Sequence, residues 1–167
     1  MSSVTFSFPQ HRLGKIIRQP GGKSVADAVR DAAAGIETLR PPCLETIDEI
    51  LTLVDQRMNE FLATADKIVP GRRLYAAVNS IIGLAGAVGL DEVDRAAFSL
   101  CDLLDQMARM GRWDVAAVAV HVQALHLLRS PAALGSDASV RAILTGLKQV
   151  RDKVLSPDAG RVADGAN

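Results

Sequence analysis

The chain of 167 residues has the length of one ordinary domain, and its 19 basic and 19 acidic residues give a formal net charge of zero. This balance gives no reason to expect nucleic acid or an anionic membrane as a partner. Hydrophobic residues make up 49% of the chain but aromatic residues only 4%, which favours closely spaced helices over a large sheet.

The N-terminal segment 1–23 contains four basic side chains and no acidic one. We expect it to form a basic arm that is flexible or extended. Neither this arm nor any later segment has the apolar run of a secretion signal or of a membrane-spanning helix. The sequence therefore predicts a cytoplasmic protein.

A first helix is expected over 24–39. Ser24 and Asp27 can cap its start, because their side chains can accept hydrogen bonds from free backbone amides. Pro41 and Pro42 are expected to stop this helix, since proline has no N–H to donate to the preceding turn.

A second helix is expected over 44–67, where apolar residues alternate steps of three and four as in the seam of a bundle. These residues are Leu44, Ile47, Leu51, Val54, Met58, Phe61 and Ala65. Pro70 and Gly71 should break the chain before a third helix over 72–88, which Gly89 ends.

Three further helices are expected over 91–110, 113–129 and 139–155. The acidic residues in the first turn of the helix at 91–110 suit the positive end of a helix dipole, which makes their role structural. Short loops favour antiparallel neighbours, so we expect an all-α fold, an up-and-down four-helix bundle with one or two accessory helices. It should form a single domain over 24–155, followed by a disordered tail over 156–167.

The third helix has two contrasting sides at about 100° of rotation per residue. One side should face the core and carries Leu74, Ala77, Val78, Ile81, Leu84, Ala85 and Val88. The other side lacks the Lys, Glu and Gln of an ordinary solvent-facing surface and carries Arg72, Tyr75, Asn79, Ile82, Gly83 and Gly86. Each glycine inside a helix costs about 1 kcal/mol relative to alanine. Either another helix of the chain packs closely here, or a partner approaches the glycines with Tyr75 and Ile82 as apolar anchors.

The run LYAAVNSIIGLAGAVG over 74–89 resembles the signature helix of histidine-containing phosphotransfer (HPt) domains of bacterial phosphorelays. Such helices carry a phosphorylatable histidine, a lysine three positions on, a glycine four positions on, and a further glycine where the helix ends. In this register, Asn79 occupies the histidine position, Ile82 the lysine position and Gly83 the glycine position.

The segment LCDLLD over 100–105, with Gly111 and Asp114 after it, is similar to the next helix and turn of the HPt family. The resemblance covers about 44–128. It implies a four-helix bundle of the HPt type and a face that docks on receiver domains or kinases of two-component signalling.

Two departures from the HPt pattern fall on the residues that carry its chemistry. The amide nitrogen of Asn79 is not a nucleophile, because its lone pair is delocalised into the carbonyl group, unlike that of a neutral imidazole. Ile82 removes the cation that would lie beside the phosphoryl oxygens. We therefore expect Asn79 not to be phosphorylated and the protein not to be an enzyme.

His121 and His126 are the alternative phosphoryl acceptors. They lie five residues apart on one expected helix, about 140° around its axis, so they cannot share one metal ion. Cys43 and Cys101 have no paired spacing and are expected to be buried thiols. The sequence gives no reason to expect a metal or a cofactor.

The sequence and its resemblance together predict a non-catalytic signalling adaptor or regulator. It would bind a response-regulator receiver domain or a histidine kinase, as a monomer or weak homodimer, through an HPt-like face of Arg72, Tyr75, Asn79, Ile82, Gly83 and Gly86. Two alternatives stay open: an active phosphotransfer protein that uses His121 or His126, and a helical structural module that self-associates through Tyr75 and Ile82.

Overall fold

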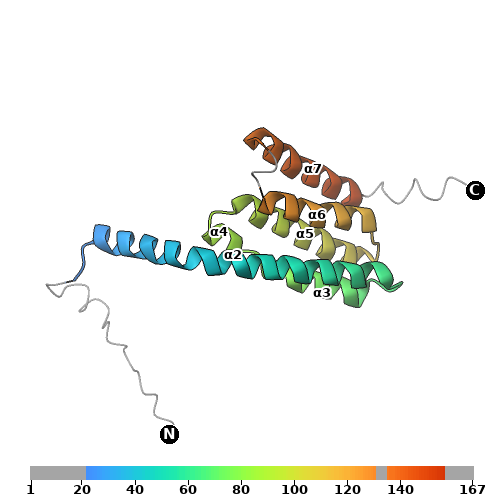
Figure 1. Cartoon of the computed structure of the whole chain (residues 1–167). Helices are drawn as coiled ribbons and strands as arrows, with labels where there is room; N and C mark the ends of the chain where they lie inside the picture. Colours follow the sequence, from blue (N-terminus) through green and yellow to red (C-terminus); the bar gives the residue numbers. More distant parts are fainter. Residues whose placement is uncertain (1–21, 131–134, 157–167) are drawn as a thin grey trace, which may run out of the picture. The chain divides into compact units, whose positions relative to one another are not determined.

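The computed structural model describes residues 22–130 and 135–156, and the regular structure of this part of the chain is entirely helical (Figure 1). The helices are α2 (Val25–Ala63), α3 (Ile68–Asn79), α4 (Leu84–Ala87), α5 (Asp91–Met110), α6 (Val115–Arg129) and α7 (Asp137–Leu155). The predicted all-α bundle is therefore confirmed. None of the described helices is both long enough and apolar enough to cross a membrane. Of the predicted arm at 1–23 and the predicted tail at 156–167, the structure describes only 22–23 and 156.

The chain divides into two units after Gly35, within α2 and within the range 24–155 that the sequence predicts as one domain. In the first unit, the described residues form the start of α2. Ser24 caps this helix, because its hydroxyl oxygen accepts a hydrogen bond of 3.1 Å from the amide of Asp27. The side chains of this stretch are exposed or half-buried.

The prediction of two helices separated by Pro41 and Pro42 is wrong, because both prolines lie inside the single 39-residue helix α2. Both are exposed, so water can hydrate the carbonyl groups that lose a backbone donor here. The side chain of Thr46 also donates a hydrogen bond of 2.9 Å to the carbonyl of Pro42. Downstream, the predicted seam holds the helix in the core through Ile47, Leu51, Val54, Met58 and Phe61, all of which are buried.

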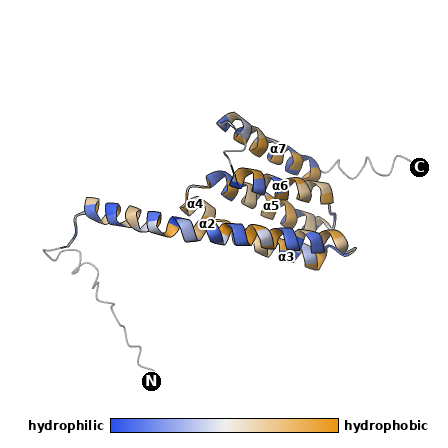
Figure 2. Cartoon of the chain, in the orientation of Figure 1, coloured by the Kyte–Doolittle hydropathy of each residue, from blue (hydrophilic) through white to orange (hydrophobic). Residues whose placement is uncertain are grey.

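In the second unit, α5 packs against α3, α4, α6 and α7, and α6 also packs against α7. Two polar contacts join α2 to α6: Asp48 accepts hydrogen bonds of 2.8 and 2.9 Å from Arg129, and Asp55 contacts His126 at 2.8 Å. In Figure 2, hydrophilic and hydrophobic residues alternate along α7. Its predicted apolar residues, Val140, Ile143, Leu147, Val150 and Val154, pack against or within the core.

Local signals set the ends of the last three helices. Gly111 ends α5 in the left-handed conformation at φ 63°, which glycine adopts without steric cost. Asp114 caps α6 by accepting a hydrogen bond of 2.9 Å from the amide of Ala117, and Ser136 caps α7. The predicted helix at 91–110 matches α5, whereas α6 and α7 each begin two residues from their predicted starts.

Candidate functional site

The candidate site is the face formed by α3 and α5. Two hydrogen bonds show that these helices run antiparallel: the amide of Gly83 donates to a carboxylate oxygen of Asp94 at 2.6 Å, and the thiol of Cys101 contacts the carbonyl of Tyr75 at 3.9 Å. The start of α5 therefore lies beside the end of α3. In this register, Phe98 of α5 lies level with Asn79 of α3.

Two aromatic side chains project from this face. Tyr75 on α3 is 38% exposed and Phe98 on α5 is 61% exposed. Phe98 shares one side of α5 with Asp94 and Asp105, because these residues are spaced by four and seven positions. Exposed aromatic residues on one side of a small domain are typical of contact surfaces. The face therefore combines apolar anchors with charged side chains around Asn79.

The expected third helix is not continuous over 72–88. After Asn79, the amides of Ile81 and Ile82 bond to carbonyl groups only three residues back, at 3.0 and 3.2 Å. Gly83 then adopts φ 83°, and its amide bonds to Asp94 rather than to the preceding turn. A side chain of α5 thus replaces a helical hydrogen bond, and the helix restarts as the short α4.

The residues predicted to face the core are buried both before and after the break. Leu74, Ala77, Val78, Ile81, Ala85 and Val88 are all buried, and Leu84 is partly buried against the core. The opposite side does not remain one helical stripe. A rotation of about 100° per residue holds only within a regular helix, so it cannot place residues beyond Asn79.

The six predicted site residues fall into three groups. Arg72, Tyr75 and Asn79 lie on the exposed side of α3. Ile82 and Gly83 lie in the turn; Ile82 is half-buried against the core and Gly83 is exposed. The position of Gly86, in α4, faces α5: a Cβ atom placed there would lie 3.8 Å from Asp91 and Asp94. The structure therefore brings Arg72, Tyr75 and Asn79 together and leaves Gly86 partly covered by the chain itself.

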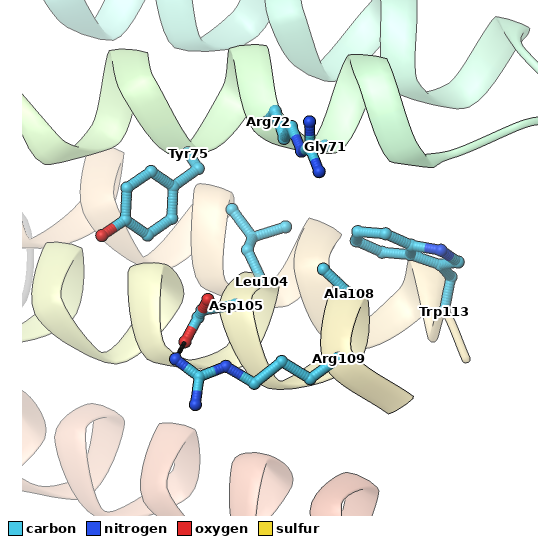
Figure 3. A pocket seen from close by; sticks show the side chains of 8 residues that line it. All are labelled: Gly71, Arg72, Tyr75, Leu104, Asp105, Ala108, Arg109 and Trp113. Carbon is cyan, nitrogen blue, oxygen red and sulfur yellow. Dashed lines mark ion pairs between the residues drawn. The ribbon is translucent and has the colours of Figure 1, made fainter. Parts of the chain in front are cut away.

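A groove of about 300 Å³ lies between α3 and α5 at the end of the face away from the turn (Figure 3). Its lining consists of Gly71, Arg72, Tyr75, Leu104, Asp105, Ala108, Arg109 and Trp113. In Figure 3, Tyr75 and Trp113 stand at opposite ends, and the ion pair of Asp105 and Arg109, at 2.7 Å, lies along the α5 side.

The indole ring of Trp113 closes one end of the groove against α3. It packs edge-on against Phe61 with ring centroids 5.6 Å apart. A Cβ atom at Gly71 would lie 2.7 Å from the ring, closer than any side chain tolerates without a shift. Gly71 is therefore not a helix breaker, as the sequence suggested, but the residue in the first turn of α3 that leaves room for Trp113.

The two candidate acceptor histidines are in different surroundings. His121 is fully buried; its Nδ1 lies 2.8 Å from the carbonyl of Ala117 and its Nε2 lies 3.2 Å from the hydroxyl of Ser99. Burial lowers the pKa of His121, and the nearby positive charge of Arg151 lowers it further against the opposing effect of the Ala117 hydrogen bond. His126 is exposed, and its Nε2 contacts Asp55.

Both cysteines are free. Cys101 is buried, and burial raises the pKa of its thiol to about 12, which keeps it protonated and unreactive at neutral pH. Cys43 is half-buried. The prediction of a buried thiol is therefore confirmed for Cys101 and only in part for Cys43.

Compared with known proteins, the chain matches no family model, no curated protein and no solved structure. The likeness to HPt domains therefore remains an interpretation of the sequence pattern.

Sequence reasoning missed Phe98 and Asp94 as members of the face. A signal for Phe98 was present, since it is a large apolar residue that lies about 140° around α5 from Val93, outside the apolar stripe that becomes buried. No local signal could identify Asp94, because its role depends on the amide of Gly83 in another segment.

Proposed function

We propose that the protein is a non-catalytic binding module that docks a receiver domain or a histidine kinase on the face formed by α3 and α5. The observation that carries the proposal is the pair of exposed aromatic residues near Asn79: Tyr75 lies one turn before it on α3, and Phe98 lies level with it on α5. Exposed aromatic side chains beside polar and charged ones are typical of protein interfaces, in which aromatic anchors form the centre and polar residues form the rim.

The chemistry of the face supports binding without phosphoryl transfer. Asn79 is exposed at the end of α3, where the HPt pattern places its histidine, and an amide nitrogen cannot accept a phosphoryl group. Burial of His121 withholds its ring from any partner's active site. The function we propose is occupation of a partner's docking surface, with no phosphoryl group passed on.

The proposal is tested by measuring the binding of the full chain to purified receiver domains and cytoplasmic kinase fragments encoded in the same genome. Phe98→Glu is the sharpest variant, because it places a charge on an exposed position that a partner must desolvate. We expect the affinity for a true partner to fall about tenfold or more. Ile82→Glu is a weaker probe, since Ile82 also packs against the core.

Val120→Glu is the matched control. Val120 is 44% exposed on α6 and lines the groove between α6 and α7, away from the proposed face. The control should keep wild-type affinity within about twofold, because rim and surface positions outside an interface contribute little. If no receiver or kinase binds, or if both variants weaken binding equally, the proposed docking face is wrong.

A second assay addresses the phosphotransfer alternative directly. The protein is incubated with active kinases and ATP, and then analysed for phosphohistidine. We expect no acid-labile label. Label on His126, which is exposed and held by Asp55, would establish the alternative.

A further inference from the structure

The groove between α3 and α5 has an apolar interior and one unbalanced positive charge. Leu104, Ala108 and the Trp113 ring supply the apolar surface. The charge of Arg109 is neutralised by Asp105 at 2.7 Å. Arg72, on the opposite side of the groove, forms no ion pair with any described residue, whereas its neighbour Arg73 lies 3.7 Å from Glu60.

We infer that this groove receives an acidic segment of the partner protein, in which a large apolar side chain lies within one helical turn of an Asp or Glu. The apolar side chain would displace water from the surface between Tyr75 and Trp113. The carboxylate would pair with Arg72, whose planar guanidinium suits a carboxylate through two parallel hydrogen bonds. This inference deepens the proposed function, because the groove is part of the same face.

The extent of the surface favours a protein segment over a small carboxylate. Ile68 is 50% exposed and lies one turn before Arg72 on α3, so apolar surface continues past the groove at one end. At the other end the surface continues toward Phe98, which shares a side of α5 with Asp105. A small ligand would fill the groove and leave both exposed side chains in water.

Trp113 is an intrinsic fluorescence and NMR probe for ligand binding in this groove. It is the only tryptophan of the chain, and its ring forms one end wall. Peptides without tryptophan are selected from a displayed random library against the full chain. Their binding is then followed through Trp113 fluorescence and the indole N–H resonance.

We expect the selected peptides to combine a large apolar residue with an Asp or Glu three or four positions away, and to change the Trp113 signals. Arg72→Glu should weaken their binding about tenfold or more, and Arg72→Gln should weaken it less. Added salt should also weaken it, because the ion pair lies near solvent. Arg73→Glu, the control, reverses a neighbouring charge that is already engaged by Glu60, and should change affinity less than about twofold.

The inference is overturned if no peptide is enriched, if the enriched peptides lack an acidic residue, or if they bind Arg72→Glu as tightly as wild type. Binding that leaves both Trp113 signals unchanged also overturns it, since the ligand would then lie elsewhere. Thermal unfolding of each variant verifies that the exposed substitutions leave the fold intact. Acidic peptides that bind as expected while no receiver or kinase binds would support the groove and refute the partner class proposed above.

Discussion

Helix α5 and the segment that faces it, from α3 to α4, differ in the continuity of their helical hydrogen bonds. α5 runs without interruption from Asp91 to Met110 and is capped by Gly111. The facing segment ends its helix at Asn79, turns, and restarts at Leu84. Helical periodicity identifies the buried residues of both segments. It places the exposed residues correctly only in α5, because the other segment is not a continuous helix. An exposed surface is therefore harder to derive from periodicity than a core.

The largest effect is expected in the core, where truncating a buried residue of either segment should cost a similar free energy of unfolding. Leu103 of α5 and Leu74 of α3 are both fully buried. Leu103→Ala and Leu74→Ala should each lower the free energy of unfolding by about 2 to 5 kcal/mol, through lost burial and the cavity left behind. Urea denaturation measures this. A loss below about 1 kcal/mol for Leu74→Ala alone would mean that the broken segment contributes little to the core.

Gly71→Ala probes the packing at the start of α3. The new methyl group would lie 2.7 Å from the Trp113 ring, so the ring or the helix must move. We expect a loss of about 1 to 3 kcal/mol in the free energy of unfolding and a change in tryptophan emission.

Gly146→Ala in α7 is the control for this substitution. Outside its chain neighbours and its own helical backbone, no atom lies within 4 Å of the position that its Cβ would occupy. The control should be neutral or stabilising by up to about 1 kcal/mol, as for glycine in an open helix. Equal changes in the free energy of unfolding for the two variants would show that Trp113 does not restrict the side chain at position 71.

Gly83→Ala and Gly86→Ala test the break itself. Gly83 lies at φ 83°, where a Cβ is strained, so alanine should lower the free energy of unfolding by about 1 to 2 kcal/mol. Gly86 lies in α4 with only ordinary contacts at its Cβ position, so alanine there should raise it by up to about 1 kcal/mol. Thermal or urea unfolding shows whether each variant lowers or raises the free energy of unfolding. A stabilising Gly83→Ala would contradict the strain that we assign to a Cβ atom at this φ.

The smallest effect is expected from pH, at the contact between α5 and α6. Burial lowers the pKa of His121 in the folded state, so the unfolded chain takes up a proton that the folded chain resists. Stability should fall as pH drops through the unfolded pKa of about 6.5, by less than about 1 kcal/mol between pH 7 and pH 6. Urea titrations of wild type and His121→Leu measure the difference. Identical pH slopes would contradict the assignment.

The sequence could predict α5 and the cores because the relevant signals are local. Acidic residues open α5, Gly111 closes it, and apolar spacing marks the buried sides. The turn after Asn79 could not be predicted, since it depends on the carboxylate of Asp94, in the first turn of α5, reaching the amide of Gly83. The continuity of α2 through Pro41 was missed for the opposite reason. A local breaking signal is present, but both prolines are exposed, so water can hydrate the carbonyl groups that lose a backbone donor and the helix continues.

The contact between Gly71 and Trp113 also constrains how this sequence can change over evolutionary time. Any side chain at position 71 collides with the indole, and a smaller residue at position 113 opens space beside Phe61. A change at either position alone should therefore lower the stability of the fold. Among descendants of this gene, the two should be inherited as a pair, or replaced together by a larger residue on α3 and a smaller one before α6.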